Sequence, residues 1–258
     1  MDDILYSTEG EIGIIAFNRP RARNALTFEM YAEVARVCSE AGNGDGIKAL
    51  IIRGTGEKAF AAGTDIAQFR SFTEPAHAHA YEAEVDRVLN AVETCRVPTL
   101  AAIHGACTGG GAAIATACDL RIASADLKFG FPIARTLGNC LSASSLSRVV
   151  QLIGAGRTKE LLFTSRLIEA EEAKSIGLIA EIVPDLDALN IRARDLAGLL
   201  AGQAPLTLRA TREAMARLRQ GVCNVEDADL VELCYMSADF REGLEAFLQK
   251  RPPNWQGR

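Results

Sequence analysis

A glycine-rich turn between an apolar run and a small-residue segment constrains the fold of this chain more than any other feature. Residues 97–103 form a short apolar run with a proline near its start, which is typical of a buried strand. Gly105 and the consecutive Gly109, Gly110 and Gly111 follow it, and the segment AAIATAC then favours a helix. Such an arrangement leaves unpaired backbone N–H groups at the positive end of the helix dipole. Because glycine has no Cβ, a ligand can approach this backbone closely.

The turn fits neither of the common nucleotide-binding loops. A P-loop requires lysine and then serine or threonine after the last glycine, and here Ala112 follows. The dinucleotide-binding pattern G-x-G-x-x-G does not fit either. A second strand pattern, residues 48–53, runs into a loop that holds Gly63 and Asp65. Two glycine loops that each follow a strand can bring one N–H group apiece to a single point, as an oxyanion hole requires. A tight turn that packs a helix on a sheet is the alternative.

Strand and helix patterns alternate along the first part of the chain. Strand patterns cover residues 4–7, 12–17, 48–53, 97–103 and 119–123, and helix patterns cover 28–41 and 81–95. This alternation predicts an α/β core with a largely parallel sheet. From about residue 186 the pattern is helical only, so we expect an α/β core at 1–185 and a helical region at 186–258. The apolar C-terminal helices have little chain left to bury them, which favours oligomerisation, although they could equally pack within the chain.

Composition narrows the classes of function. With 258 residues, 48% of them hydrophobic, the chain can bury one large core. The net charge of −5 and the absence of a basic stripe argue against a nucleic-acid partner. Seven cysteines at scattered positions indicate reduced thiols, and no Cys/His/Asp set has metal-ligand spacing. The segment MDDILYSTEG has no signal-peptide character, and no apolar run approaches the ~18 residues of a membrane span. We therefore expect a soluble cytoplasmic protein.

Six segments in a fixed order resemble the crotonase (enoyl-CoA hydratase/isomerase) superfamily. They are NRP with NAL, FAAGTDI, HGACTGGG leading to CDLRIAS, FGFPIARTLG, LLFTSRLIEAEEAKSIGLIAEIV and SADFREGLEAFLQKRPPNW, and together they cover essentially the whole chain. The resemblance implies a spiral of ββα units with a C-terminal helical region that forms trimers, often paired into hexamers. It implies an acyl-CoA thioester as substrate, with coenzyme A present as part of that substrate and no other cofactor.

The resemblance also assigns the two N–H donors. In the family, one belongs to the residue after the glycine of the A-G-x-D loop, which is Thr64 here, and the other belongs to the middle glycine of the G-G-G run, Gly110. A thioester enolate carries its negative charge on one oxygen, and a single preorganised donor is worth about 3–4 kcal/mol there. Because the backbone supplies both donors, the resemblance implies that this part of the machinery is intact.

The two glutamates that hydratases of this family use are replaced by apolar residues. The positions that match them are Ala113, two residues after the glycine run, and Ile133, after the proline of FGFPI. Hydration needs one group to deprotonate water and another to protonate carbon, each worth about 10²–10⁴-fold in rate. Neither alanine nor isoleucine can move a proton, so these positions argue against the ordinary hydratase mechanism and against isomerisation by the second glutamate.

The remaining site assignments also come from the resemblance. Asn139 and Cys140 are the candidates for replacing the missing catalytic groups, although no histidine lies near Cys140 in sequence to activate it. The acyl pocket is expected to involve Asp65, Ala113, Ile133, Arg135 and Leu141, and coenzyme A is expected to contact Arg21, Arg23, Ala25, Lys58, Ala61 and Lys250. His104 is interpreted as a structural brace, and His77 and His79 point in different directions on a helix, so they cannot share one ligand.

These observations predict an acyl-CoA-processing enzyme of the enoyl-CoA hydratase/isomerase family that stabilises a thioester enolate with backbone N–H groups. An acyl-CoA decarboxylase or C–C lyase is an alternative, because such a substrate generates its own carbanion and needs the two donors most. A non-catalytic acyl-CoA-binding subunit is the alternative from a different class.

Overall fold

The computed structural model describes residues 2–219, 221, 237–249 and 251–258. A six-stranded sheet runs through its centre in the order β1-β2-β3-β5-β7-β10. Its strands are β1 (Ile4–Glu9), β2 (Ile12–Phe17), β3 (Ala49–Gly54), β5 (Thr99–Ile103), β7 (Leu120–Ser124) and β10 (Glu181–Val183). β1 pairs antiparallel with β2, and every other neighbour in this sheet is parallel. The predicted α/β architecture with a largely parallel sheet is confirmed.

A second sheet of four short strands lies beyond the carboxyl ends of the first. It consists of β4 (Ala59–Ala61), β6 (Ala106–Thr108), β8 (Lys128–Gly130) and β9 (Ile168–Glu169) in that order. Each of β3, β5 and β7 is followed directly by one short strand of this sheet and then by a helix. The chain therefore repeats a ββα unit, as the resemblance implies, and each repeat places a loop at the same end of the molecule.

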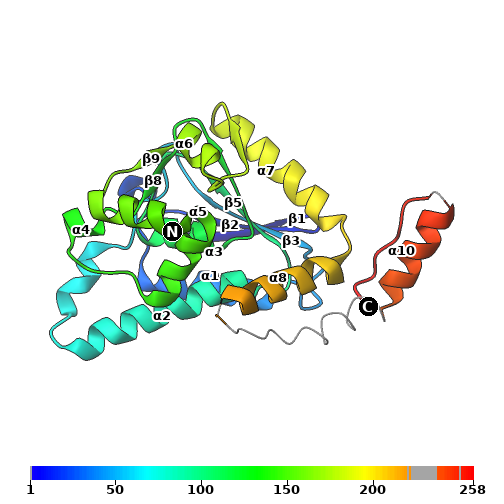
Figure 1. Cartoon of the computed structure of the whole chain (residues 1–258), viewed down its shortest axis with the longest axis horizontal. Helices are drawn as coiled ribbons and strands as arrows, with labels where there is room; N and C mark the ends of the chain where they lie inside the picture. The colour runs from blue at the N-terminus through cyan, green and yellow to red at the C-terminus, as the bar shows by residue number, and fades with distance from the viewer. Residues whose placement is uncertain (1, 220, 222–236, 250) are drawn as a thin grey trace.

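The helices cover the two faces of the central sheet because each strand alternates its apolar side chains between them. Ile15 and Phe17 of β2 belong to a large apolar core with α1 (Phe28–Glu40), α2 (Pro75–Glu93), α3 (Gly110–Ala117) and α5 (Ala143–Thr164). Ile14 belongs to a smaller core on the opposite face, which is covered by α7 (Leu186–Ala201). Figure 1 shows α7 well separated from α1 and α2, which run together along the lower side of the molecule.

The remaining helices are shorter or peripheral. They are η1 (Pro20–Ala22), η2 (Ile66–Ser71), α4 (Ile133–Thr136), α6 (Ala170–Ser175), α8 (Pro205–Arg219) and α10 (Ala238–Gln249). Asp185 caps the start of α7 by accepting a hydrogen bond from the Ala188 N–H at 2.8 Å, so the helical part of the chain begins where the sequence pattern changes. Figure 1 shows α10 at the edge of the molecule, beyond α8.

Most of the expected elements are present, with shifted ends. The helix expected at 81–95 begins at Pro75, because this proline occupies the first turn, where a missing N–H is tolerated. The helical segment VEDADLVELCYM lies outside the described residues. Among the helices of the described part of the chain, none combines the length and the apolar character needed to cross a membrane. The five cysteines in this part are free thiols.

Candidate active site

A cavity of about 170 Å³ lies between the glycine loops and the helices α2, α3 and α5. The loops that border it follow β4 and β6, beyond the carboxyl ends of β3 and β5. In sheets of parallel strands, ligands bind at this end of the strands. Its lining includes Thr64 and Gly110, together with Gly63, Thr108, Gly109 and Ala113.

Thr64 and Gly110 are neighbours, although they lie on different loops. Gly63 has a φ of +104°, a conformation that L side chains rarely adopt, and this brings its loop across Leu26. The Leu26 N–H donates to the Gly63 carbonyl at 2.8 Å, and the Asp65 N–H donates to the Leu26 carbonyl at 2.8 Å. These two bonds flank Thr64, whose own N–H finds no acceptor within the described part of the chain.

The N–H of Gly110 lacks an acceptor for a related reason. Gly110 is the first residue of α3, where the N–H groups have no carbonyl one turn earlier. The residue that precedes the helix is Gly109, which has no side-chain oxygen to cap them. Two N–H groups without partners in the described residues therefore belong to the lining of one cavity, at the positive end of a helix dipole. Such a pair can polarise a carbonyl group.

Two tyrosine hydroxyl groups fix the position of Thr64. Its Oγ1 lies 2.9 Å from the Tyr31 hydroxyl of α1 and 2.8 Å from the Tyr81 hydroxyl of α2. Burial raises the pKa of Tyr31 well above its usual value, and burial also raises the pKa of Tyr81. Both phenols therefore stay protonated at neutral pH and act as hydrogen-bond donors or acceptors without a change of charge.

The hydroxyl group of Tyr31 explains why residue 110 is glycine. A Cβ atom at this position would lie 1.8 Å from the Tyr31 Oη and 3.0 Å from the Thr64 Oγ1. Any side chain at 110 would therefore displace Tyr31. A substitution of Gly110 by proline removes the N–H but also introduces this clash, so it needs a matched control.

One wall of the cavity is apolar where the resemblance implies glutamates. Ala113 on α3 and Ile133 at the start of α4 both line it, with Leu137, Leu141, Val85 and Phe69. Because Ala113 and Ile133 carry no titratable group, this wall excludes charge and cannot transfer a proton.

Among the described residues that line the cavity there is nevertheless one carboxylate, which sequence reasoning missed. Glu82 of α2 lines it between Tyr81 and Val85, and its burial raises its pKa above the usual value, with Asp86 adding to the rise. In the sequence Glu82 is one of several acids on a charged helix, a pattern typical of a solvated face. The only available signal is its position next to Tyr81, at the edge of the apolar face of the predicted helix.

Some of the predicted catalytic and acyl-pocket residues line the cavity, and others do not. Asn139, Cys140 and Leu141 line the cavity, at the segment that leads into α5. Two predicted pocket residues are not in its lining. Asp65 instead accepts a hydrogen bond from the Ala67 N–H at 3.2 Å and pairs with Arg19 at 3.0 Å, so it fixes the start of η2. Arg135 is exposed on α4, because its side of this short helix faces away from the cavity.

The residues expected to contact coenzyme A lie on neighbouring loops. Arg21, Arg23 and Lys58 are exposed, and the Arg23 carbonyl accepts a hydrogen bond from the Ala62 N–H at 3.0 Å, which joins its loop to that of Thr64. Ala25 is half-buried. The side chain of Ala61 is fully buried in β4, packed against α3, so it cannot contact a ligand. Lys250 lies outside the described residues.

The histidines are not part of the cavity lining. His104 is buried between β5 and β6, and burial lowers its pKa. Neither of its ring nitrogens has a hydrogen-bond partner among the described residues, so its interpretation as a brace stays a prediction. The Nδ1 of His77 accepts a hydrogen bond from the Thr73 N–H at 3.2 Å, and His79 is exposed. The described residues contain no group of three or more His, Cys, Asp or Glu that could hold a metal ion.

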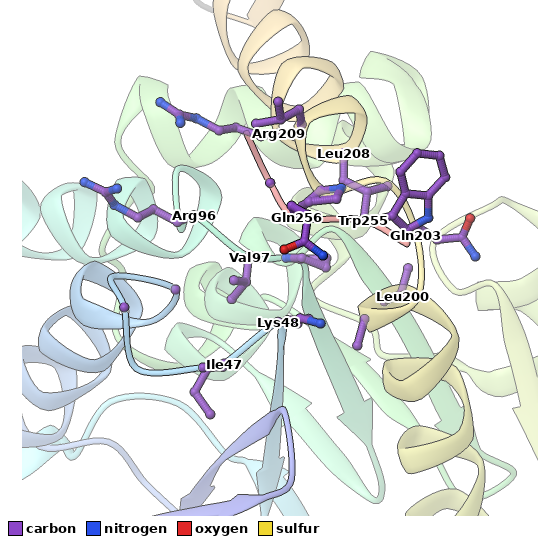
Figure 2. A pocket seen from close by; sticks show the side chains of 18 of the residues that line it. Ile47, Lys48, Arg96, Val97, Leu200, Gln203, Leu208, Arg209, Trp255 and Gln256 are labelled. Carbon is purple, nitrogen blue, oxygen red and sulfur yellow. The ribbon is translucent and has the colours of Figure 1, made fainter. Parts of the chain in front are cut away.

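A larger cavity of about 550 Å³ lies at the opposite end of the strands (Figure 2). It surrounds the chain that enters β3 and β5, and apolar Ile47, Val97 and Leu200 line it together with Lys48, Arg96 and Arg209. The tail of the chain, with Trp255, forms part of the wall. This cavity borders the amino ends of the strands and includes neither Thr64 nor Gly110. The smaller cavity is therefore the candidate active site.

Comparisons with known proteins identify the family of this chain. The sequence profile of the enoyl-CoA hydratase/isomerase family matches residues 7–258. The short-chain-enoyl-CoA hydratase of Clostridium acetobutylicum is 31% identical, over 97% of this chain and 96% of that protein. The crotonyl-CoA hydratase of Syntrophomonas wolfei is 33% identical, over 98% of both.

Solved structures show the same arrangement of the chain. The enoyl-CoA hydratase of Bacillus anthracis superposes with a TM-score of 0.87 at 31% identity and covers 100% of both chains. An enoyl-CoA hydratase/carnithine racemase of Magnetospirillum magneticum superposes with a TM-score of 0.90 at 34% identity, over 100% of this chain and 97% of the other. The expected crotonase-like fold is confirmed.

Proposed function

Because the chain belongs to the enoyl-CoA hydratase/isomerase family, we propose that it binds an acyl-CoA thioester with the carbonyl oxygen between the N–H groups of Thr64 and Gly110. One observation carries this assignment. Two adjacent backbone N–H groups, without acceptors in the described residues, belong to the lining of one cavity at the start of a helix.

The proposed reaction passes through a thioester enolate. When the α-carbon gains an electron pair, negative charge moves to the thioester oxygen, and each preorganised N–H donor stabilises it by about 3–4 kcal/mol. The hydroxyl contacts from Tyr31 and Tyr81 hold Thr64 in place beforehand, so the donors need no reorganisation during the reaction. Arg21, Arg23 and Lys58 are proposed to bind the phosphates of coenzyme A, because they are exposed cations on loops next to that of Thr64.

Enoyl-thioester hydration or isomerisation is the first reaction to test, since the relatives are named as enoyl-CoA hydratases. The apolar wall of Ala113 and Ile133 favours a second candidate, decarboxylation or C–C cleavage of an acyl-CoA. In those reactions the bond that breaks supplies the electron pair of the enolate, so no glutamate at either position is required.

The decisive experiment removes one donor without the clash. Tyr31→Phe removes the hydroxyl that a Cβ at residue 110 would meet. In this background Gly110→Pro deletes the N–H, and Gly110→Ala retains it with the same Cβ. Hydration of crotonyl-CoA is followed as loss of the enone absorbance. We expect the proline variant to be slower than the alanine variant by about 10²–10³-fold.

A spectroscopic readout separates binding from turnover. The thioester carbonyl stretch of a bound dienoyl-CoA should move to lower frequency in the alanine variant and less in the proline variant. A polarised carbonyl without hydration directs the search to 2-carboxyacyl-CoA decarboxylation. Binding of the thioester without polarisation contradicts the proposed function and leaves an acyl-CoA-binding subunit.

A further inference from the structure

The candidate active site contains a single carboxylate among the described residues of its lining, and that carboxylate belongs to Glu82. Glu82 lies on α2 directly after Tyr81, whose hydroxyl is 2.8 Å from the Oγ1 of Thr64. Val85, one turn later, also lines the cavity, so this part of α2 forms one of its walls. The carboxylate therefore shares the cavity with the two N–H donors.

The surroundings of Glu82 suit a proton acceptor. Asp86, one turn later on α2, raises the pKa of Glu82 by its charge, and no cation is found among the described lining residues. The protonated phenols of Tyr81 and Tyr31 interact with Glu82 electrostatically. The backbone N–H of Ser142 donates a hydrogen bond to Glu82, which opposes the rise of its pKa. Arg148 of α5 interacts electrostatically with Asp86 and pairs with Glu93 at 2.8 Å. Burial and Asp86 together raise the pKa of Glu82, which increases its basicity once it is ionised.

The other polar groups near the cavity are less suited to this task. Asn139 cannot accept a proton, and Ser145 donates its hydroxyl to Asp86 at 3.3 Å. Asp86 itself accepts a hydrogen bond from the Ser142 hydroxyl at 2.7 Å and is not part of the cavity lining. Asp86 holds the start of α5 through these two hydroxyl groups, and its place outside the lining separates it from Glu82.

We propose that Glu82 is the general base that removes a proton from the α-carbon of the bound thioester and returns it to carbon. It thereby takes over proton transfer at a site where Ala113 and Ile133 stand in place of glutamates. This inference rests on the proposed function, because the enolate that it forms is the one that Thr64 and Gly110 stabilise.

The step balances without any further reactant. A Glu82 carboxylate oxygen bonds to the α-proton, and the electron pair of the C–H bond becomes the second bond between the α-carbon and the carbonyl carbon. The electron pair of the C=O bond moves to the oxygen, which accepts hydrogen bonds from the two N–H groups. The reverse step delivers the proton from Glu82 to carbon. In deuterated water the acid exchanges its proton with solvent, so deuterium enters at the α-carbon.

The test measures this exchange directly and does not require the natural acyl group. Butyryl-CoA is incubated with the full-length protein in deuterated water, and deuterium at the α-carbon is measured by mass spectrometry. We expect Glu82→Gln to lower the exchange rate by at least about 100-fold, since a general base contributes 10²–10⁴-fold. Thioester affinity and the lowered carbonyl frequency of the bound dienoyl-CoA should persist in this variant. Glu82→Asp should restore part of the exchange.

Asp86→Asn is the matched control, because residue 86 lies on the same helix and contacts the same segment before α5 but is outside the lining. Its plateau rate should stay within about threefold of the wild type. The pH profile adds a signature that a purely structural role would not produce. The base must be ionised, so exchange should fall tenfold per pH unit below the raised pKa of Glu82. Removal of the Asp86 charge should shift this acidic limb of the pH–rate profile to lower pH, because the charge of Asp86 raises the pKa of Glu82.

Each outcome decides the question. The proposal is supported if Glu82→Gln loses deuterium exchange, while Asp86→Asn keeps the plateau exchange rate and shifts the acidic limb of its pH profile. Full exchange in Glu82→Gln overturns it, and so does equal loss in both variants, which would make Glu82 a brace for α5. A wild-type protein that polarises the bound thioester but shows no exchange overturns it while the proposed function stands. A bound thioester that is not polarised contradicts the proposed function itself.

Discussion

Glutamate and glutamine have nearly the same size and shape, but only glutamate can transfer a proton. This contrast can test whether the apolar wall of Ala113 and Ile133 is positioned for hydration. The double substitution Ala113→Glu with Ile133→Glu should place two carboxylates on the apolar wall formed by these two residues. We expect it to hydrate crotonyl-CoA at least about 100-fold faster than the equally bulky Ala113→Gln with Ile133→Gln, because general acid and base groups each contribute 10²–10⁴-fold. Loss of the enone absorbance measures both rates. Equal rates in the two proteins would mean that the wall is not positioned for hydration.

A second residue with a measurable effect is His104, which is 1% exposed and whose pKa burial lowers. The nearby Asp126 opposes this shift and Arg53 reinforces it. The unfolded chain binds a proton at His104 as the pH falls through about 6.5, whereas the folded protein binds it only at lower pH. Stability is therefore lost as the pH falls, by at most about 1.4 kcal/mol per pH unit from this group.

Urea denaturation between about pH 5 and about pH 8 checks this prediction. His104→Gln should have a shallower dependence of the free energy of unfolding on pH than the wild type, whatever its absolute stability. His79→Gln, which removes an exposed imidazole instead of a buried one, is the control. A His104→Gln slope equal to that of the wild type would contradict a depressed pKa at this residue.

At the scale of elements, a buried charge network holds three helices together. Glu93 at the end of α2 pairs with Arg148 of α5 at 2.8 Å and with Arg219 of α8 at 2.6 Å, and both arginines are almost fully buried. Glu93→Gln would leave two buried guanidinium groups without their carboxylate, and we expect it to lower the free energy of unfolding by about 3–5 kcal/mol. Thermal or urea unfolding measures this loss.

The matched control for this network lies on the same helix. Glu84 pairs with Arg87 at 2.6 Å, and both side chains are solvent-exposed. Glu84→Gln should therefore cost no more than about 1 kcal/mol. A similar loss in both variants would show that the buried network contributes no more than an ordinary surface ion pair.

The elements also show which features the sequence could predict. β2 occupies the expected residues 12–17, because its apolar run is long enough to be buried on both faces of a sheet. β4, β6 and β8 have three residues each, which is too short for any periodicity to appear. The glycine loops were recognisable because a free backbone N–H depends on the main chain and not on distant side chains. Glu82 was not, because its burial depends on α5 packing against α2, which only the folded chain brings about.

At the scale of the whole molecule, α8 presents apolar side chains to solvent. Met215 is 54% exposed and Leu218 is 58% exposed, and their spacing of three residues places them on one face of the helix. Each such side chain would contribute about 1.5–3 kcal/mol if another copy of the chain buried it. We therefore propose that this face of α8 contacts a second copy in the trimer or hexamer expected from the sequence.

Light scattering coupled to size-exclusion chromatography tests this proposal. The wild type should have three or six times the 27.6 kDa of one chain, and Met215→Glu with Leu218→Glu should reduce the mass toward a single chain. The charged side chains should have this effect because an assembly would have to bury unpaired carboxylates, which costs more free energy than dissociation into single chains. Ile191→Glu with Leu199→Glu, at two exposed positions of α7, is the control and should keep the wild-type mass. A monomeric wild type would mean that no contact between copies exists. An α8 variant that keeps the full mass would mean that the contact lies elsewhere.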